Sequence, residues 1–487
     1  MDHDSVPFST PGPSSHRSKD IRETYERITR EGLEVMGEQI NSEPAYTSNV
    51  SGHLAWDVSL LVRAACAAWR ATADPVHLRQ AASWAQHLCE RTDVDSGTRN
   101  WRGRVGNAWS AGPRYTAATA PLGSIAGVPI QIQAAADAIR IERPTTGTVT
   151  VHAMRDGSTI WSSPEASVKP DARSYLPDVL AEKSAVHAVL LRNLPAPIDL
   201  SGLEARDVRL VPQFAPHLVH TGMITRSLLS AAQALDAAGP RTPGADVTPD
   251  DLFTTAERAL AEHDQEIRTL SGQSWYITPE DFPGRRLGLD LPHNHIVDVA
   301  TSLLVIGDRR DDKSRRTLGA SLTRRFTREI DAYEAGVIRH PWFYYPVDSD
   351  IFFGVERERP LAERRVRAVR RAEDSSHATM RVRALAEWRR IDSKLVEDAT
   401  LSSVALSFRR HFIAVTDGIS TLRWLPGDAN DAPRQGYADT YAGAWGALAP
   451  WDRSIKRRIN SIAFQHPPSA VFGATVLSAA EILELNS

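Results

Sequence analysis

Residues 373–388 read EDSSHATMRVRALAEW, the pattern of a helix that begins at a charged end. Asp374 or Ser375 can accept hydrogen bonds from the free N–H groups of a first helical turn. His377 and Met380 follow at the spacing that puts side chains on one helix face. Because helix N-termini attract negative charge, the stretch predicts the edge of a binding site for an anionic substrate. The alternative is that Asp374 is only a cap and His377 only a satisfied core histidine.

Helical periodicity continues on both sides of this stretch. Apolar spacing predicts helices at 21–36, 54–69, 76–88, 216–229, 250–270, 296–306, 308–333, 395–412, 437–448, 451–464 and 470–485. The connections at Asp74-Pro75 and at residues 307–313 are short, whereas other connections are long and carry Trp, Tyr, His and Arg. This asymmetry predicts a mainly α fold, an (α/α) toroid of antiparallel helix hairpins whose long loops line an open mouth.

The periodicity changes between residues 122 and 212. Short strand candidates occur at 130–132, 139–141, 149–151 and 189–191, separated by turns such as Asp156-Gly157. We therefore predict three parts: a disordered tail at 1–20, a toroid catalytic domain at 21–121 and 213–487, and a β-rich insertion domain at 122–212.

Composition narrows the function classes. The chain has 487 residues, 42% of them hydrophobic, and a formal net charge of −3, which predicts no strong attraction to nucleic acid or to an anionic membrane. Cys66 and Cys89 fall in helical patterns and are expected to be core residues. The polar tail lacks the apolar region of a signal peptide, and no apolar run reaches the ~18–20 residues that span a bilayer. We expect a soluble cytoplasmic protein. Phosphate-binding glycine loops and a Gly-x-Ser-x-Gly elbow are both missing from the sequence.

Several stretches together carry a family resemblance: 109–116 (WSAGPRYT), 214–224 (FAPHLVHTGMI), 342–345 (WFYY) and 373–378 (EDSSHA). They resemble (α/α)-toroid proteins similar to the C-terminal domain of D-glucuronyl C5-epimerase and to alginate-lyase-type polysaccharide lyases. The resemblance covers roughly 21–121 and 213–485 and leaves out the insertion. It implies a carbohydrate-active enzyme that handles uronic acids, although toroids host several chemistries. Because such enzymes generally work outside the cytoplasm, the expected location favours a small glycosylated substrate over a polymer.

The implied chemistry is abstraction of a proton from the carbon next to a carboxylate, as in a lyase or an epimerase. It needs a clamp on the carboxylate, a base, and an acid for the leaving oxygen or for the opposite face. By residue type and loop position, the candidates are Arg114 and Asn294 for the clamp, His377 or His220 for the base, and Tyr115 or Tyr344 for the acid.

Aromatic side chains in the long loops suit stacking on sugar rings. The candidates for substrate binding are Trp109, Trp275 and Trp342, together with His293 beside Asn294. The alternative is that these aromatic side chains only hold loops against the helices.

Two other function classes remain open. Glu373 or Asp374 could serve an inverting or retaining glycoside hydrolase, which needs two carboxyl groups about 5–9.5 Å apart. The candidate partner carboxylates are Asp57, Glu280, Asp290 and Asp348. A non-catalytic toroid that binds a glycan or a protein is the other alternative. A catalytic toroid should bring Tyr115, His220, Asn294 and His377 around one cavity.

For two further motifs we favour a structural role over a functional one. His293 and His295 could bind zinc with His377 or Asp298, but alternate residues at a helix start point in different directions, so capping and core roles are expected and no cofactor is assigned. The arginine-rich stretch 357–371 could steer an anionic substrate, but a solvated helix face is the simpler expectation.

Overall fold

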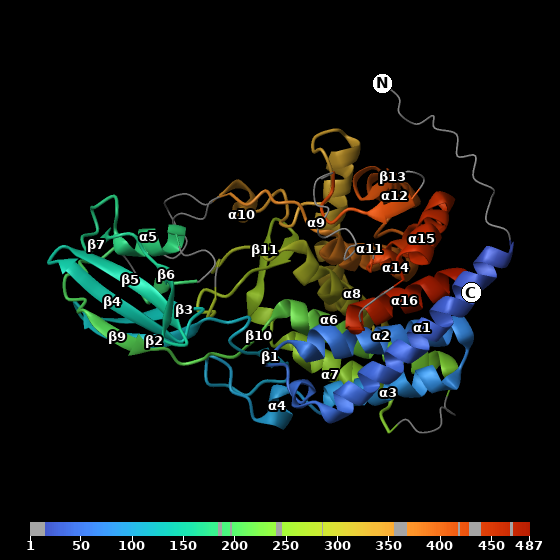
Figure 1. Cartoon of the computed structure of the whole chain (residues 1–487), viewed down its shortest axis with the longest axis horizontal. Helices are drawn as coiled ribbons and strands as arrows, with labels where there is room; N and C mark the ends of the chain where they lie inside the picture. The colour runs from blue at the N-terminus through green and yellow to red at the C-terminus, as the bar shows by residue number, and fades with distance from the viewer. Residues whose placement is uncertain are drawn as a thin grey trace.

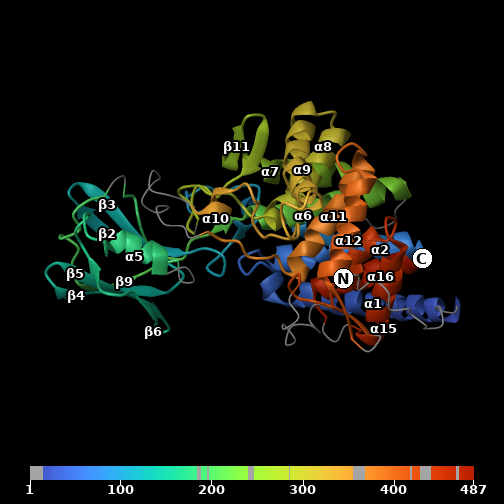
Figure 2. The same cartoon turned by 90° about the horizontal axis from the view of Figure 1, so that it is seen from above.

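The structure is a computed structural model that describes residues 15–183, 188–194, 197–239, 246–284, 286–354, 368–416, 419–427, 440–467 and 471–487. A helical part and a smaller β-rich part lie side by side (Figures 1 and 2). Each part has its own cluster of buried hydrophobic residues. The prediction of a mainly α fold with a β-rich insertion is confirmed at this level. Within the described ranges, no helix is both long enough and apolar enough to cross a bilayer.

The helices largely follow the predicted segments. Those before the β-rich part and after it up to residue 309 are α1 (Ser15–Ser42), α2 (Ser59–Thr72), α3 (Pro75–Cys89), α4 (Asp93–Ser96), α6 (Leu218–Ala238), α7 (Pro249–Ala261) and α8 (His293–Arg309). Those that follow are α9 (Lys313–Glu334), α10 (Asp350–Phe353), α11 (Ser375–Ile391), α12 (Asp398–His411), α14 (Ala442–Trp445), α15 (Arg453–Gln465) and α16 (Gly473–Asn486). A π-helical turn, η2 (Leu54–Val58), leads into α2, and single 3-10 turns lie at Pro44–Tyr46, Asp264–Glu266 and Gly446–Leu448.

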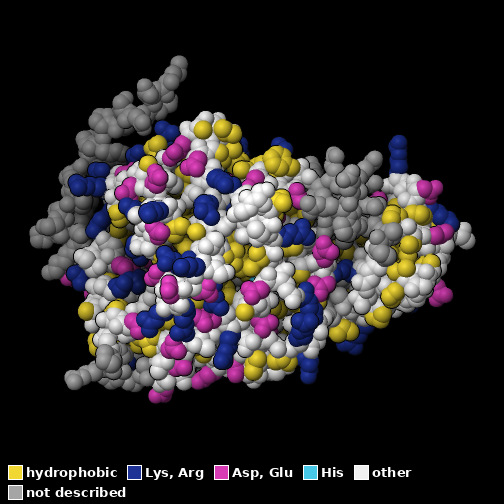
Figure 3. Space-filling model, turned by 180° about the vertical axis from the view of Figure 1, so that it is seen from behind, with side chains coloured by type: hydrophobic (Ala, Val, Ile, Leu, Met, Phe, Trp, Pro, Cys, Tyr) yellow, Lys and Arg dark blue, Asp and Glu magenta, His cyan; other side chains and the backbone are white. Residues whose placement is uncertain are grey.

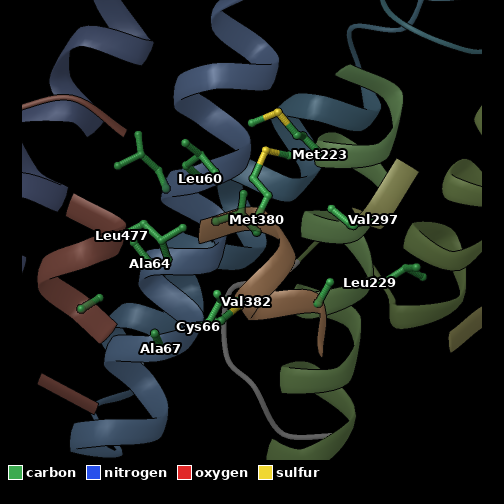
Figure 4. Packing of buried hydrophobic residues seen from close by; sticks show 14 of the residues in the cluster. Leu60, Ala64, Cys66, Ala67, Met223, Leu229, Val297, Met380, Val382 and Leu477 are labelled. Carbon is green, nitrogen blue, oxygen red and sulfur yellow. The ribbon is translucent and has the colours of Figure 1, made fainter. Parts of the chain in front are cut away.

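Among the described residues, six helices contact one another in a closed order: α2, α6, α8, α11, α14 and α16, with α16 packed back against α2. Other helices pack around them: α3 on α2, α7 on α6, α9 on α8, α15 on α14 and α1 on α16, while α12 contacts α9. Apolar side chains of the inner helices meet inside this ring, as Leu60, Met223, Val297 and Met380 do in Figure 4. Burying each such side chain contributes about 1.5–3 kcal/mol.

Local signals explain where several helices begin. Asp74 accepts a hydrogen bond from the Val76 N–H (2.8 Å), and Pro75 occupies the first turn of α3. Asp374 caps α11 by accepting from the His377 N–H (3.1 Å). The predicted cap at Asp374 and the predicted place of Pro75 in the first turn of α3 are therefore confirmed.

The β-rich part contains two sheets. One has the strand order β2-β3-β8, formed by Ala118–Ile125, Val128–Ala134 and Leu190–Arg192. The other has the order β6-β5-β4-β9, formed by Ser158–Ser162, Thr148–Arg155, Ala138–Thr145 and Arg206–Arg209, with β7 (Ala166–Ser167) paired to β5. Ile139, Ile141, Val149 and Val151 alternate along β4 and β5 and are buried in the core of this part, beside α5 (Leu176–Lys183).

A two-residue ladder marks the junction between the two parts. Strand β1 (Ser110–Ala111) pairs antiparallel with β10 (Ala215–Pro216), so that Ser110 faces Pro216. The chain therefore leaves the helical part and returns to it at neighbouring points.

The structure corrects three sequence-based boundaries. The helix predicted at 250–270 ends at Ala261, and β11 (Ile267–Leu270) pairs with β12 (Gln273–Tyr276) across Ser271 and Gly272, whose positive φ angles of 50° and 74° suit a tight hairpin turn. Helix α1 begins at Ser15, inside the predicted tail, whose first residues (1–14) lie outside the described ranges. The helix predicted at 437–448 is described only from residue 440 onward and contains α14 and one 3-10 turn.

Charges of both signs are interspersed over the helical part on the face seen in Figure 3. This mixed surface agrees with the formal net charge of −3.

Candidate functional site

The N-terminal ends of the inner helices meet at one end of the ring, which we call the mouth. Trp56 at the start of the α2 segment donates to His220 near the start of α6 (3.1 Å), and its ring lies 6.4 Å from that of His377 in the first turn of α11. A pocket of about 290 Å³ lies beside these side chains, with Tyr115, His217, Arg286, His295 and Tyr344 among its lining residues. His220 and His377 do not line it, but their rings lie 4.6 Å from that of Tyr115 and 5.9 Å from that of Tyr344, respectively. Side chains far apart in sequence therefore share one site.

Asp374 and His377 form a hydrogen-bonded pair in this mouth. Asp374 Oδ2 lies 2.7 Å from His377 Nδ1, while Asp374 Oδ1 accepts from the hydroxyl of Ser376 (2.5 Å). Burial alone would lower the pKa of His377, but the hydrogen bond and the charge of Asp374 outweigh it and raise that pKa above its ordinary 6.5. Since Nδ1 is hydrogen-bonded to Asp374, Nε2 is the nitrogen that can exchange a proton with a ligand.

Two aromatic rings hold the imidazole of His377 between them. Tyr344 and Trp56 both meet it edge to face, with ring centroids 5.9 and 6.4 Å away. The guanidinium of Arg371 lies over the Tyr344 ring at 3.7 Å. Burial raises the pKa of Tyr344 even though Arg371 opposes the shift, so this phenol keeps its proton at neutral pH and can donate it.

His220 lies in the same mouth but is poorly suited to act as the base. Its Nε2 accepts from the indole N–H of Trp56, and its Nδ1 faces the amide nitrogen of Asn49 at 3.2 Å. The ring is fully buried, and burial first, then nearby cationic and imidazole groups, lowers its pKa well below 6.5. Because its Nε2 is occupied by the Trp56 N–H and its ring is fully buried, His220 is a neutral anchor for Trp56, which corrects the alternative that made it a base.

Tyr115 stands directly over His220, with ring centroids 4.6 Å apart and planes at 85°. Its hydroxyl approaches Gly52 so closely that a Cβ there would lie 2.5 Å from it, and Gly52 also has a φ of +84°. Burial raises the pKa of Tyr115, while Arg114 opposes that shift. Tyr115 is thus a second protonated phenol in the mouth, placed by a glycine that the sequence did not single out.

The pocket lining contains two guanidinium groups and two carboxylates. Arg114 and Arg286 line the pocket, and burial lowers the pKa of His217 to about 4 and that of His295 to about 3, so both imidazoles are neutral. The lining also includes two carboxylates: Glu266 lies 2.9 Å from the imidazole of His263, and Asp290 shares Arg325 with Asp348. Arg114 and Arg286 are therefore the groups of the lining that can bind an anionic group of a ligand.

Three predicted site residues lie inside the protein, away from the mouth, and their assigned roles are corrected. Glu373 is fully buried 2.6 Å from Arg381, and burial raises its pKa to about 7. Trp109 and Trp342 are also fully buried and donate to Leu88 O (2.9 Å) and Ser407 Oγ (2.8 Å). These tryptophans stabilise the helical core and cannot stack on a sugar in this conformation.

Three other candidates lie near the mouth without lining its pocket. His293 is buried against Glu329 (2.8 Å), and Trp275 on β12 lies under Arg325 at 5.4 Å. Asn294 is buried, and its Oδ1 has no hydrogen-bond partner within the described ranges. His293 faces Glu329 whereas His295 lines the pocket, so the two do not converge on one ion; among the described residues, no three His, Cys, Asp or Glu side chains are placed to hold a metal.

The carboxylates considered as glycosidase partners all have cationic or imidazole neighbours. The pairs are Asp57 with His53 (2.7 Å), Glu280 with Arg268 (3.7 Å), Asp290 with Arg325 (2.7 Å) and Asp348 with Arg325 (2.8 Å). With Glu373 inaccessible as well, the geometry gives the hydrolase alternative little support.

Sequence reasoning missed Gly52, Trp56, His217 and Arg286. The structure shows that Trp56 lies on a π-helical turn, and such turns are frequent at functional sites. The sequence alone does not reveal this turn. Within the arginine-rich stretch, Arg370 and Arg371 are described, while Arg357, Arg359, Arg364, Arg365 and Arg367 lie outside the described residues.

Comparison with known proteins adds no assignment. No family model, no curated protein and no solved structure matches the chain.

Proposed function

We propose that the helical part is an (α/α) toroid and that the chain is a carbohydrate-active enzyme. It would act on a uronate-containing or related saccharide by proton abstraction, as a lyase or an epimerase. The closed order of the inner helices supports the toroid. The observation that carries the activity is the Asp374–His377 pair, which meets Trp56 and Tyr344 beside a pocket lined by Arg114 and Arg286.

In this mechanism a guanidinium from Arg114 or Arg286 holds the substrate carboxylate and stabilises the enolate-like charge that develops on it. His377 Nε2 takes the proton from the neighbouring carbon, and Asp374 stabilises the imidazolium that forms. For a lyase, the electron pair of the broken C–H bond forms a C=C bond as the bond to the leaving oxygen breaks. A phenol then gives that oxygen its proton.

Tyr344 and Tyr115 are the two candidate phenols. Because burial raises the pKa of both, each holds a proton at neutral pH. For an epimerase, the phenol instead protonates the same carbon from the opposite face, and no bond to oxygen breaks. The two reactions therefore use the same base and differ in where the acid delivers its proton.

The test combines absorbance near the ultraviolet edge with proton exchange. Purified protein is incubated with a panel of uronate-containing saccharides in D₂O; a conjugated double bond marks a lyase, and deuterium at the carbon next to the carboxylate without absorbance marks an epimerase. H377A should abolish either signal, whereas H152A, a change on β5 in the β-rich part, should leave it intact.

Other outcomes would redirect the assignment. New reducing ends without absorbance or exchange would indicate a hydrolase, and saccharide binding without turnover would indicate a non-catalytic toroid. An unchanged turnover number in H377A would rule out the proposed base. A cytoplasmic location and a small glycosylated substrate remain predictions, tested by cell fractionation and by including small glycosides in the panel.

A further inference from the structure

The pocket beside His377 is not formed by the helical part alone. Among its lining residues, Ala135 and Ala188 belong to the β-rich part, and the others belong to the helical part. Ala135 directly follows β3, and Ala188 lies two residues before the start of β8. Because β3 and β8 are antiparallel, with Gln133 opposite Leu190, both alanines lie at the same end of this strand pair. This end of the β-rich part therefore forms one side of the pocket, which we call the wall.

A buried hydrogen-bond network joins the wall to a loop of the helical part. Gln133 is fully buried and donates to Ala188 O (3.3 Å) and to Gly284 O (2.6 Å). Arg192 donates to the side-chain oxygen of Gln133 (2.7 Å) and to Phe282 O (2.6 Å). Phe282 and Gly284 also line the pocket. Because an unpaired buried polar group is costly, this network holds the wall and the loop in one relative position.

The lining at the wall is apolar. Ala135, Ala188 and Phe282 line the pocket here. Ala117, another lining residue, lies beside them, because its N–H donates to Pro283 O (2.8 Å) in the same loop. An apolar group of a ligand is therefore favoured against the wall, whereas an anionic group is favoured at the two arginines of the lining.

The size of the two alanines matters because the pocket is small. Its volume of about 290 Å³ lies at the lower end of the ~300–1,000 Å³ typical of small-molecule sites, so a few added methylene groups change what fits. Ala188 has a positive φ of 52°, where a larger side chain would also strain the backbone, whereas the φ of Ala135 is not positive. The carbonyl oxygen of Ala135 accepts from Arg155 Nη2 (2.8 Å), a bond that a new side chain leaves in place. Ala135 is therefore the position at which the wall can be changed without straining the backbone.

We propose that the wall determines the specificity of the pocket and receives an apolar substituent of a small uronate glycoside. Arg114 and Arg286 hold the carboxylate of the sugar, and an aryl group on its anomeric oxygen lies against Ala135 and Ala188. The substrate class is then a uronate with an apolar group attached, in contrast to the interior of a uronate polymer, whose neighbouring sugars are polar. The sugar part of this assignment rests on the proposed function, whereas binding at the wall does not require turnover.

The experiment is isothermal titration calorimetry of the full chain with two probes, methyl glucuronide and phenyl glucuronide, which differ only in the group on the anomeric oxygen. The wild type should bind phenyl glucuronide about tenfold more tightly, because the ring buries apolar surface against the wall. In A135L the leucine side chain occupies the space of that ring, so the preference should fall about tenfold, to near equality. A135V, with a smaller side chain, should give an intermediate preference.

A172L is the matched control. It adds the same side chain to another half-buried alanine of the β-rich part, one that does not line the pocket, and should keep the wild-type preference. Melting temperatures show whether each variant is folded, and A135V carries the comparison if A135L is not.

Several outcomes would overturn the assignment of the wall. They are failure of the wild type to bind either probe, equal binding of both probes by the wild type, an unchanged preference in both Ala135 variants, and the same loss of preference in A172L. Failure of the proposed function has a different result: no saccharide then gives a turnover signal that depends on His377, while the loss of preference in A135L still supports the wall.

Discussion

The residue that caps helix α11 also tunes the imidazole of its first turn. Asp374 binds the His377 backbone N–H (3.1 Å) and ring Nδ1 (2.7 Å), so one carboxylate both starts the helix and sets the charge of the proposed base. The neighbouring Glu373 instead lies buried against Arg381. The sequence predicts the cap but cannot tell which of the two adjacent carboxylates reaches the mouth, because that depends on how the preceding loop enters the helix.

The first prediction concerns D374N. Asparagine caps helices about as well as aspartate, so α11 should persist, while loss of the charge should lower the pKa of His377. Titration of the His377 ring by NMR in both proteins measures this shift. A pKa that does not change would mean that Asp374 only caps the helix.

The second prediction is the pH dependence of the same pair. The pKa of His377 is raised above 6.5, so its contribution to stability is fully present below pH 6.5 and is lost as pH rises through the folded-state pKa. The pKa of Asp374 is lowered below 3.8 by His377 although burial opposes this, so its contribution is present above pH 3.8 and is lost as pH falls through the folded-state pKa. Urea unfolding should therefore separate wild type from D374N most clearly between pH 3.8 and 6.5. Turnover should show the opposite trend and rise with pH, since the base must be deprotonated.

The third prediction tests how Tyr115 is placed. G52A adds a Cβ at a φ of +84° and 2.5 Å from the Tyr115 hydroxyl, whereas G103A adds one at a φ of +73° with open space around it. Both should lose about 1–2 kcal/mol for the left-handed backbone. G52A should lose roughly 1–3 kcal/mol more because of the overlap, together with activity. Equal unfolding free energies for the two variants would show that Tyr115 can move away at no cost.

At the scale of elements, the helices with clear caps and long apolar faces were predictable, and the connections between them were not. Strand β11 was predicted as the end of a helix because Ile267 continues the spacing of Phe253, Ala256 and Leu260, and β12 was predicted as loop. The turn at Ser271 and Gly272, across which Ile267 pairs with Tyr276, was the local signal of the hairpin, and the helical spacing outweighed it.

One loop of the mouth is held by the β-rich insertion, and this gives the fourth prediction. Arg192 donates to Phe282 O (2.6 Å) and Glu280 O (3.0 Å), while the buried Gln133 donates to Gly284 O (2.6 Å). R192A should therefore speed hydrogen exchange in residues 279–284 and raise KM more than it lowers kcat, because Arg286 follows in the same loop. R140A, which breaks an exposed pair with Asp207 in the same part, should leave that exchange unchanged.

At the scale of the whole molecule, the ring depends on close contact between α14 and α16. A Cβ at Gly443 would overlap the backbone carbonyl oxygen of Ser478, and backbone cannot yield as a flexible side chain can. G443A should lower the melting temperature of the helical part, with a loss of roughly 1–3 kcal/mol or more. Because the two hydrophobic clusters are separate, the transition of the β-rich part should not move. Differential scanning calorimetry measures both, and G147A, at a position with open space, is the control. A single transition that shifts as a whole would show that the two parts unfold together.

The pairing of β1 with β10 brings the two ends of the insertion together, so the insertion could be replaced as a unit. Thr119 and Val211 are also paired, so a short Gly/Ser bridge between them could replace the β-rich part without stretching the helices and would keep Arg114 and Tyr115. A foreign domain with adjacent ends could be grafted at the same place. A different module attached there would leave the helices unchanged but would have to supply its own support for the loop that Arg192 and Gln133 hold.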